Sequence, residues 1–294
     1  MNNIKKFSIF ICFVLVLVIS VIFLFNFHNI SEEKLLSIHM IDVGQGDSIL
    51  IITPNGKTIL IDAGDKSEGS KVASYLKKSK IETLDILIAT HPHSDHIGGM
   101  PSIINNFQVG KFYMPELVHT TKTFENMLNA AKANSLKIST LPIGAKIEFD
   151  QGIDLYFLSP FKDYGDNLNN WSIVMKLDYL DKSFIFTGDI EQEAEMDILT
   201  EYEPQFLRSH LLKIAHHGSS SSSSEEFLNV VRPHIGLIST GLNNSYNHPH
   251  KETLKSLKEK GVHMYRTDSQ GTVVIKSNGK EIWSHREPYS YPDF

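Results

Sequence analysis

An uninterrupted apolar run stands near the start of this 294-residue chain. Residues 7–25 read FSIFICFVLVLVISVIFLF, without a charge or a proline. As a helix at ~1.5 Å per residue, the run would be about 28 Å long, close to the thickness of a bilayer's hydrocarbon core. The pattern predicts a transmembrane helix over residues 7–27, with a cytoplasmic tail at residues 1–6 and a linker at residues 28–35.

The charges that flank the run predict its orientation. Lys5 and Lys6 precede it and SEEK follows it, which favours an inner N-terminus and an outer remainder. The alternative is a cleaved signal peptide, but the run is longer than the apolar part of most signals, and no small-x-small motif follows it. We therefore expect a single-pass protein of the cell membrane whose main domain is extracellular.

Short apolar strands and amphipathic helices alternate beyond the linker. Strand-like runs occur at residues 36–43, 48–53, 58–62 and 84–90, and again at 154–158, 172–177, 183–187, 211–215, 235–239 and 272–275. Helical spacing occurs at 68–79, near His96, and at 124–133, 191–199, 225–231 and 251–260. Two halves of this kind predict an α+β fold of four αββα layers, with two mixed sheets face to face. We expect residues 36–294 to form this domain, with the serine run at residues 219–224 as a mobile loop.

Composition narrows the function only slightly. The chain has 28 basic and 34 acidic residues and a net charge of −6, and the part beyond the apolar run carries −8. An acidic domain argues against a nonspecific coat for nucleic acid, although it permits a local basic groove. The one cysteine, Cys12, lies in the apolar run, so the chain offers no internal disulfide and no cysteine-based zinc site.

The strongest chemical signal is the segment THPHSDHIGG, residues 90–99, directly after an apolar strand. It contains His91, His93, Asp95 and His96 within six positions. Imidazoles and carboxylates are ligands for zinc and similar divalent cations, and two pairs of them suggest two metals. A histidine-rich surface loop is the alternative, and this dense spacing disfavours it.

Two later clusters also follow apolar strands. FTGDIE places Asp189 after the first of these strands, and KIAHHGS places His216 and His217 after the second. Taken singly, such an aspartate is often a helix cap and such a histidine pair is often solvated. Taken with the first segment, they repeat one pattern of histidines and aspartates at strand ends.

These motifs in this order resemble the metallo-β-lactamase fold hydrolases. HMIDVGQGDSILI, THPHSDHIGG, NNWSIVMKL, FTGDI, KIAHHGS, NHPH and YRTDSQGTVVI are similar to the extracellular hydrolase domain of ComEC-type competence proteins. The resemblance runs from about residue 36 to residue 275. One candidate span cannot form the channel of such a transporter, so we expect a stand-alone, membrane-anchored relative.

The resemblance implies two divalent metal ions, zinc or manganese. By position, His91 and His93 would hold one metal, Asp95 and His96 the other, and Asp189 would bridge them. Either His216 or His217 would complete the second site. The family's usual third histidine has no clear match, because NNWS occupies that stretch instead.

The resemblance also suggests roles around the metals. Asp42, Asp47 and Asp62 would brace the metal-binding loops, and Asp95, His217 and His248 are the predicted catalytic residues. For Asp62 a turn cap is the alternative. The predicted substrate contacts are Gln45, Asn170, Lys213 and Ser219, of which Lys213, like His248, could equally be a solvated surface residue.

Two metals would lower the pKa of a water and stabilise charge on the attacked centre. The subgroup favours a phosphodiester, with nucleic acid as the first substrate class. The alternatives are phosphoesters of the cell envelope, and a catalytically idle module that binds DNA or a partner. A β-lactam is less expected, because the third histidine is missing. The sequence does not indicate an oligomeric state.

Overall fold

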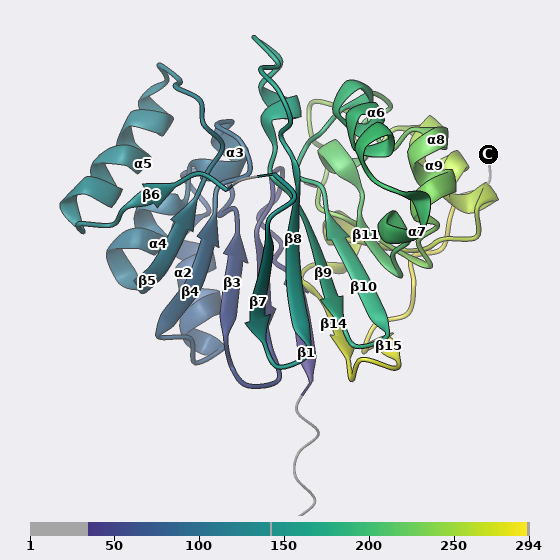
Figure 1. Ribbon diagram of the computed structural model, residues 1–294, viewed down its shortest axis with the longest axis horizontal. Coiled ribbons are helices and arrows are strands. Elements are labelled where there is room, and N and C mark those ends of the chain that lie inside the picture. The colour runs from purple at the N-terminus through teal and green to yellow at the C-terminus, as the bar shows by residue number, and fades with distance from the viewer. Residues whose placement is uncertain (1–34, 142, 293–294) are drawn as a thin grey trace, which may run out of the picture. The chain divides into compact units, whose positions relative to one another are not determined.

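Two β-sheets form the centre of the computed structural model, which describes residues 35–141 and 143–292 (Figure 1). In the first sheet the order is β15-β14-β1-β2-β3-β4-β5-β6, and in the second it is β13-β12-β11-β10-β9-β8-β7. The strands of the first sheet are β1 (Leu36–Met40), β2 (Ile49–Ile52), β3 (Thr58–Ile61), β4 (Thr83–Ile88), β5 (Gln108–Tyr113), β6 (Ile138–Ser139), β14 (Val273–Ser277) and β15 (Ile282–Ser284). Those of the second are β7 (Lys146–Asp150), β8 (Ile153–Ser159), β9 (Val174–Tyr179), β10 (Lys182–Phe186), β11 (Leu211–Lys213), β12 (Ile235–Ile238) and β13 (His263–Arg266).

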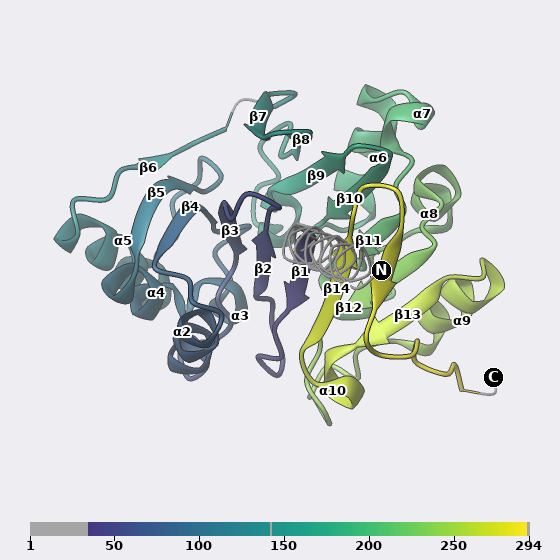
Figure 2. The same cartoon turned by 90° about the horizontal axis from the view of Figure 1, so that it is seen from below.

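Helices cover the outer face of each sheet (Figures 1 and 2). Beside the first sheet lie α2 (Gly69–Lys78), α3 (Ser94–Ile97), α4 (Met100–Asn106) and α5 (Lys122–Ala133). Beside the second lie α6 (Gln192–Glu201), α7 (Pro204–Leu207), α8 (Glu225–Val231) and α9 (Lys251–Glu259). The short helices η1 (Leu168–Trp171), η2 (Ala215–Gly218) and α10 (Thr267–Gln270) lie in connections. The predicted αββα sandwich is therefore confirmed.

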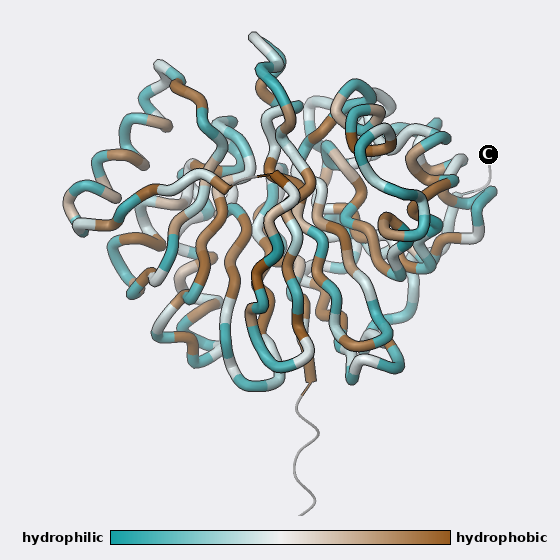
Figure 3. Tube along the Cα trace, viewed as in Figure 1, coloured by the Kyte–Doolittle hydropathy of each residue, from teal (hydrophilic) through white to brown (hydrophobic). Residues whose placement is uncertain are grey.

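Three layers of apolar side chains hold the sandwich together. The central layer joins the two sheets, with residues such as Ile61 and Ile88 from the first and Phe157 and Phe184 from the second. One outer layer packs α2, α4 and α5 onto the first sheet, and the other packs α6, α8 and α9 onto the second. Apolar positions accordingly follow the strands of both sheets (Figure 3). Burial of apolar area is the main favourable term in folding, so these layers position every loop that the sheets carry.

Several predicted elements differ in extent from the observed ones. The first predicted strand ends at Met40, because Asp42 begins a turn in which its carboxylate accepts the N–H of Gly44 at 3.1 Å. The strand predicted at residues 172–177 begins at Val174 and follows η1. Five strands were not predicted, because none of them has more than two buried residues: β5, β6, β7, β13 and β15.

The serine run is ordered, which corrects the predicted mobile loop. The Oγ atom of Ser223 accepts the N–H of Ala215 at 3.2 Å, and Ser224 caps α8. The N–H groups of both serines donate to the buried carboxylate of Glu195. The serine run thus forms a packed turn, because the carboxylate of Glu195 accepts hydrogen bonds from its backbone N–H groups.

The predicted transmembrane helix, residues 7–27, lies outside the described residues. Across residues 35–141 and 143–292, no helix has the length and apolar character to cross a membrane.

Candidate metal centre

Three strand ends, one from the first sheet and two from the second, meet at one edge of the sandwich. After β4 the chain passes through Thr90 and His91 and turns into α3, which carries Asp95 and His96. After β10 it turns at Gly188, which has a positive φ of 55°, into Asp189. After β11 it enters η2, in which His217 also has a positive φ, of 54°. The separate motifs of the sequence are therefore brought together by the packing of the two sheets.

The imidazoles and carboxylates at this edge lie within metal-binding distance of one another. Three groups whose ligand atoms all lie within 4.8 Å share His96: the first adds His91 and Asp189, the second adds Asp95 and His217, and the third adds Asp47 and Asp62. The Oδ2 atom of Asp189 is 3.1 Å from the Nε2 atoms of both His96 and His217. A single carboxylate oxygen thus faces ligands from both sheets, the position expected of a bridge between two cations.

His217, and not His216, belongs to this cluster. The Nε2 atom of His217 is 3.3 Å from Oδ2 of Asp95, and its side chain is only 2% exposed. The side chain of His216 is 23% exposed and its Nδ1 atom lies 3.3 Å from Glu191. Of the two alternatives, the structure therefore brings His217 to the ligands.

His93 completes the other end of the cluster. Its Nδ1 atom is 3.0 Å from Nε2 of His91, and Asn169 of η1 interacts with its ring. The Oδ1 atom of Asn169 is buried and makes no well-formed hydrogen bond within the described part of the chain. Asn169, the neighbour of the predicted Asn170 in the NNWS motif, therefore lies beside the ring of His93 with an oxygen that is free to bind a ligand.

Buried polar groups fix the orientation of the ligands. Asp62 accepts the Nδ1–H of His96 at 2.8 Å and both the N–H and the hydroxyl of Thr90, at 2.8 and 2.6 Å. Ser172, for which no role was predicted, lies 3.3 Å from Nδ1 of His91 and accepts the N–H of Asp189 at 3.0 Å. Such partners set the tautomer and direction of metal-binding imidazoles.

Lys213 lies behind the cluster, which corrects its predicted contact with substrate. It is fully buried, and its Nζ atom bonds to Asp47 at 2.6 Å, to the carbonyl of Gly188 at 2.6 Å and to Oδ1 of Asp189 at 3.2 Å. Asp47 in turn approaches Nδ1 of His217 at 3.5 Å, so the four side chains form a closed ring of alternating charge. One oxygen of Asp189 is thereby occupied, and only Oδ2 faces the other ligands.

Three further predicted roles also change. Asn170 is buried and accepts the N–H of Glu191 at 2.8 Å, so it shapes the loop after Asp189 and does not contact substrate space. Ser219 bonds to Ser221 inside the serine run. Asp42 caps the turn at Gly44 and lies 3.8 Å from Lys71, away from the ligands.

The electrostatics of the cluster fit divalent cations. Burial alone would lower the pKa of His96 and His217, but the charge of Asp189 raises both well above the usual histidine value. Burial alone would raise the pKa of Asp189, but the charges of His217 and His96 lower it. Without a metal, protons on these two imidazoles compensate the negative charge of the carboxylates, and a bound cation would take over that role. Imidazoles and carboxylates are donors that suit zinc or manganese.

A cavity of about 210 Å³ opens onto this cluster. Its walls include Gln45, Tyr246 and His248 beside ligand residues of both sheets. Burial, with His216 and His217 nearby, lowers the pKa of His248 to about 4, so its ring is neutral at pH 7. Gln45 accepts the N–H of Gly241 through Oε1 at 3.2 Å. Gln45 and His248 thus both line the cavity beside the candidate ligands.

The fold and this centre define a metal-dependent hydrolase of the αββα type. The chain belongs to the metallo-beta-lactamase superfamily, whose family model matches residues 41–241. It is 31% identical to ComE operon protein 3 of Bacillus subtilis over 92% of this chain and 36% of that protein. It is 28% identical to competence protein ComA of Neisseria gonorrhoeae over 79% of this chain and 31% of that protein. The resemblance to competence proteins is therefore confirmed, and the chain spans about a third of the length of these relatives.

More distant similarities agree with this fold. The chain is 26% identical to endoribonuclease ysh1 of Aspergillus fumigatus over 57% of its own length and 21% of that protein. Among solved structures, the metallo-beta-lactamase fold protein YhfI of Bacillus subtilis matches 83% of this chain and all of its own, with 14% identity and a TM-score of 0.52. The diiron β-hydroxylase CmlA of Streptomyces venezuelae matches 82% of this chain and 54% of its own, with 12% identity and a TM-score of 0.54.

Proposed function

We propose that this protein is a binuclear metal-dependent phosphodiesterase that acts on nucleic acid at the outer face of the membrane. The observation that carries the proposal is the arrangement around Oδ2 of Asp189, which lies 3.1 Å from an imidazole of each sheet. The names of the relatives support the substrate class, because they include competence proteins, endoribonucleases and ribonuclease Z.

The side chains present define how two cations would be held. His91 and His93, with Asn169 beside them, would hold the first, and Asp95, His96 and His217 the second. Asp189 would be shared through Oδ2, because Lys213 holds Oδ1. Two such cations supply a water of lowered pKa and stabilise negative charge on the attacked phosphorus.

The remaining residues of the cavity would act on the substrate itself. His248 is neutral, and its buried Nδ1 atom has no hydrogen-bond partner within the described residues. A neutral imidazole at this place can donate a hydrogen bond to a non-bridging phosphate oxygen as charge develops there. Loss of one such donor typically lowers the rate ~10²–10³-fold. His248→Ala should therefore keep its metals and lose about that factor in kcat, and loss of metal would instead identify His248 as a ligand.

Substitution of Asp189 tests the metal assignment. The full-length protein in detergent, loaded with manganese or zinc, would be assayed for metal content and for cleavage of single-stranded DNA, double-stranded DNA, RNA and a small phosphodiester. Asp189→Ala should lose most of its metal and all hydrolysis, because the remaining ligands would leave two cations facing each other unscreened. The matched control is Asp181→Ala, an exposed aspartate just before the opposite end of the same strand β10.

The outcomes separate the alternatives. A parent protein that binds metal but cleaves only envelope phosphoesters, a lactone or a β-lactam would contradict the nucleic-acid assignment. A folded parent that retains no metal would favour the idle binding module. Activity of Asp189→Ala near the parent level would remove the bridging role.

Membrane anchoring is a separate part of the proposal. The uncharged run at residues 7–25, with Lys5 and Lys6 before it, favours an uncleaved anchor with the hydrolase domain outside. Protease added to intact cells should digest the domain, and N-terminal sequencing should find a start before Phe7. A mature N-terminus after residue 27 would show a cleaved signal instead.

A further inference from the structure

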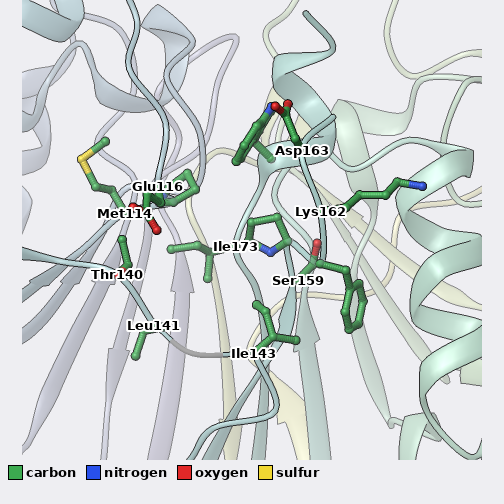
Figure 4. A pocket seen from close by; sticks show the side chains of 13 residues that line it. Met114, Glu116, Thr140, Leu141, Ile143, Ser159, Lys162, Asp163 and Ile173 are labelled. Atoms are coloured by element: carbon green, nitrogen blue, oxygen red, sulfur yellow. The ribbon is translucent and has the colours of Figure 1, made fainter. Parts of the chain in front are cut away.

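A second, larger cavity lies between the two sheets' loops, with a volume of about 500 Å³ (Figure 4). It lies where β5, β6 and β8 end and beside η1, and we call it the Ser159 pocket. Its walls include Ser159, Phe161, Trp171 and Ile173. The volume is typical of a pocket for a small organic ligand.

This pocket adjoins the candidate metal centre through one short segment. Trp171 and Ile173, which line the pocket, flank Ser172, whose hydroxyl lies 3.3 Å from the metal-binding ring of His91. The N–H of Ile173 donates to the carbonyl of Thr90 at 3.0 Å, next to His91 in the chain. The Ser159 pocket and the candidate metal centre therefore lie on either side of the segment that carries Ser172.

The charges of the lining disfavour a phosphate in this pocket. Lys162 is the only cation among the lining residues, and its Nζ atom already pairs with Glu193 at 3.0 Å and Asp197 at 2.9 Å. The other charged lining residues are the acids Glu116 and Asp163. Most of the remaining wall is apolar or aromatic, so the pocket suits an uncharged, largely apolar group.

One buried hydroxyl indicates that this group also forms a hydrogen bond. Ser159 is 1% exposed, and within the described residues its Oγ atom has no hydrogen-bond partner. Figure 4 shows this side chain among those that surround the pocket, near Ile173. Buried polar groups are normally paired, so an unpaired one that lines a cavity points to a ligand that supplies the partner.

We propose that the Ser159 pocket receives the base of a nucleotide next to the attacked phosphodiester. A nucleobase is flat, uncharged and largely apolar on its faces, and its edge carries the groups that a serine hydroxyl can pair with. Stacking on rings such as Trp171 and Phe161 would accept any base, as is usual for single-stranded nucleic acids. The inference rests on the proposed function for its substrate, whereas the pocket itself can be tested without catalysis.

Fluorescence of Trp171 provides that test. The chain has two tryptophans, so Trp283→Phe leaves Trp171 as the sole reporter. Full-length protein in detergent would be titrated with thymidine and deoxyguanosine, which carry no phosphate. We expect saturable quenching, about 5–10-fold weaker binding in Ser159→Ala from the loss of one hydrogen bond, and unchanged binding in the control Ser74→Ala on α2. Calorimetric titration of the parent with the same nucleosides measures their binding affinity in a protein that keeps both tryptophans.

Kinetics with matched substrates complete the experiment. Ser159→Ala should raise KM for a thymidine dinucleotide by a similar factor and leave KM for the corresponding abasic dinucleotide, which has no base, unchanged. Nucleoside binding without cleavage of nucleic acid would support the pocket and contradict the proposed function. Absence of nucleoside binding by both fluorescence and calorimetry, or binding that Ser159→Ala leaves unchanged, would overturn the pocket assignment even in an active phosphodiesterase.

Discussion

Lys213 shows how a single buried charge organises the candidate site. Its ammonium group contacts Asp47 and Asp189, and all three side chains are at most 2% exposed. The lysine offsets part of the cost of burying the two carboxylates, since a buried carboxylate without a partner is costly. The same contact leaves Asp189 with one oxygen for cations. Lys213 is therefore a buried residue that positions Asp189, and it is not the solvated surface residue that its sequence context allowed.

Replacement of Lys213 should destabilise the fold strongly. Lys213→Met keeps most of the apolar stem but removes the ammonium group that Asp47 and Asp189 share, and we expect a loss of about 3–5 kcal/mol in the free energy of unfolding. The matched control is Lys176→Met, since Lys176 is also buried but its partner Asp178 is partly exposed and can be hydrated. Urea denaturation in the presence of a chelator measures both. Equal losses of unfolding free energy in the two variants would show that the ring of charges around Lys213 stabilises the fold no more than an ordinary buried ion pair does.

Residue types and spacing predicted which motifs carry the chemistry, but not the direction of each side chain. HxHxDH, Asp189 and the histidine pair were identified because ligand types followed apolar strands. The choice between His216 and His217 depends on backbone angles in η2, with φ of 48° and 54°. Asn170 turned inward because its acceptor pairs with the N–H of Glu191, a residue 21 positions away. Contacts of this kind are not encoded in local spacing.

At the scale of elements, the loop GQGD between β1 and β2 packs directly against α3. Gly46 has φ of 124°, and a Cβ atom there would lie 2.1 Å from the carbonyl oxygen of Asp95. The same oxygen accepts the N–H of Asp47 at 3.2 Å. The loop therefore supports the turn that carries two candidate ligands, which explains a glycine-rich motif far from those ligands in sequence.

Substitution of Gly46 should therefore displace Asp95 and His96 together. Gly46→Ala should lower metal content and cost at least ~2 kcal/mol of stability, because overpacked positions force the backbone to move. Gly44→Ala is the control, since Gly44 also has a positive φ, of 66°, but its Cβ would meet no atom within 4 Å. Metal analysis and thermal denaturation compare the two. Full metal content in Gly46→Ala would contradict the support role of the loop.

His39 on β1 links the first sheet to α2 and should make stability depend on pH. Its Nδ1 atom lies 2.8 Å from the hydroxyl of Tyr75. Burial, with Lys276 nearby, lowers its pKa from 6.5 to about 4. Below pH 6.5 the unfolded chain takes up a proton that the folded chain does not, so this stabilising contribution is present above pH 6.5 and is lost as the pH falls toward 4.

Replacement of His39 should therefore reduce the loss of stability in acid. His39 contributes at most ~1.4 kcal/mol per pH unit to this loss. The free energies of unfolding at pH 7 and pH 5 should differ less in His39→Gln than in the parent, and the exposed control His263→Gln should match the parent. A parent-like slope in His39→Gln would show that this imidazole does not resist protonation in the folded state.

Most elements followed from apolar runs and helical periodicity, whereas the unpredicted ones depend on partners. The strand β5, QVGKFY, has only its last two residues buried, and it forms because it pairs in parallel with β4 and β6. In the same way β1 pairs with β14, more than two hundred residues later, which no local pattern indicates. Strand identity could therefore be predicted best where both faces are buried.

At the scale of the whole domain, the candidate ligands join its two sheets. His91, His93, Asp95 and His96 follow a strand of the first sheet, and Asp189 and His217 follow strands of the second. A large apolar layer also lies between the sheets, with residues such as Phe157, Phe184 and Ile88 fully buried. The sandwich should consequently persist without metal, while bound cations would add stability across the sheet-to-sheet contact.

Removal of metal should lower the melting temperature without unfolding the protein at room temperature. At a free metal concentration ~1,000 times Kd, binding to the folded state alone adds about 4 kcal/mol, which corresponds to roughly 5–15 °C in Tm for a domain of this size. Thermal denaturation with and without EDTA measures the shift, and added manganese or zinc should restore it. Asp189→Ala should show almost no shift, because it lacks the oxygen that both ligand groups face. A parent Tm that is indifferent to EDTA and to added metal would show that the cluster does not bridge the two sheets through cations, whatever reaction the cavity supports.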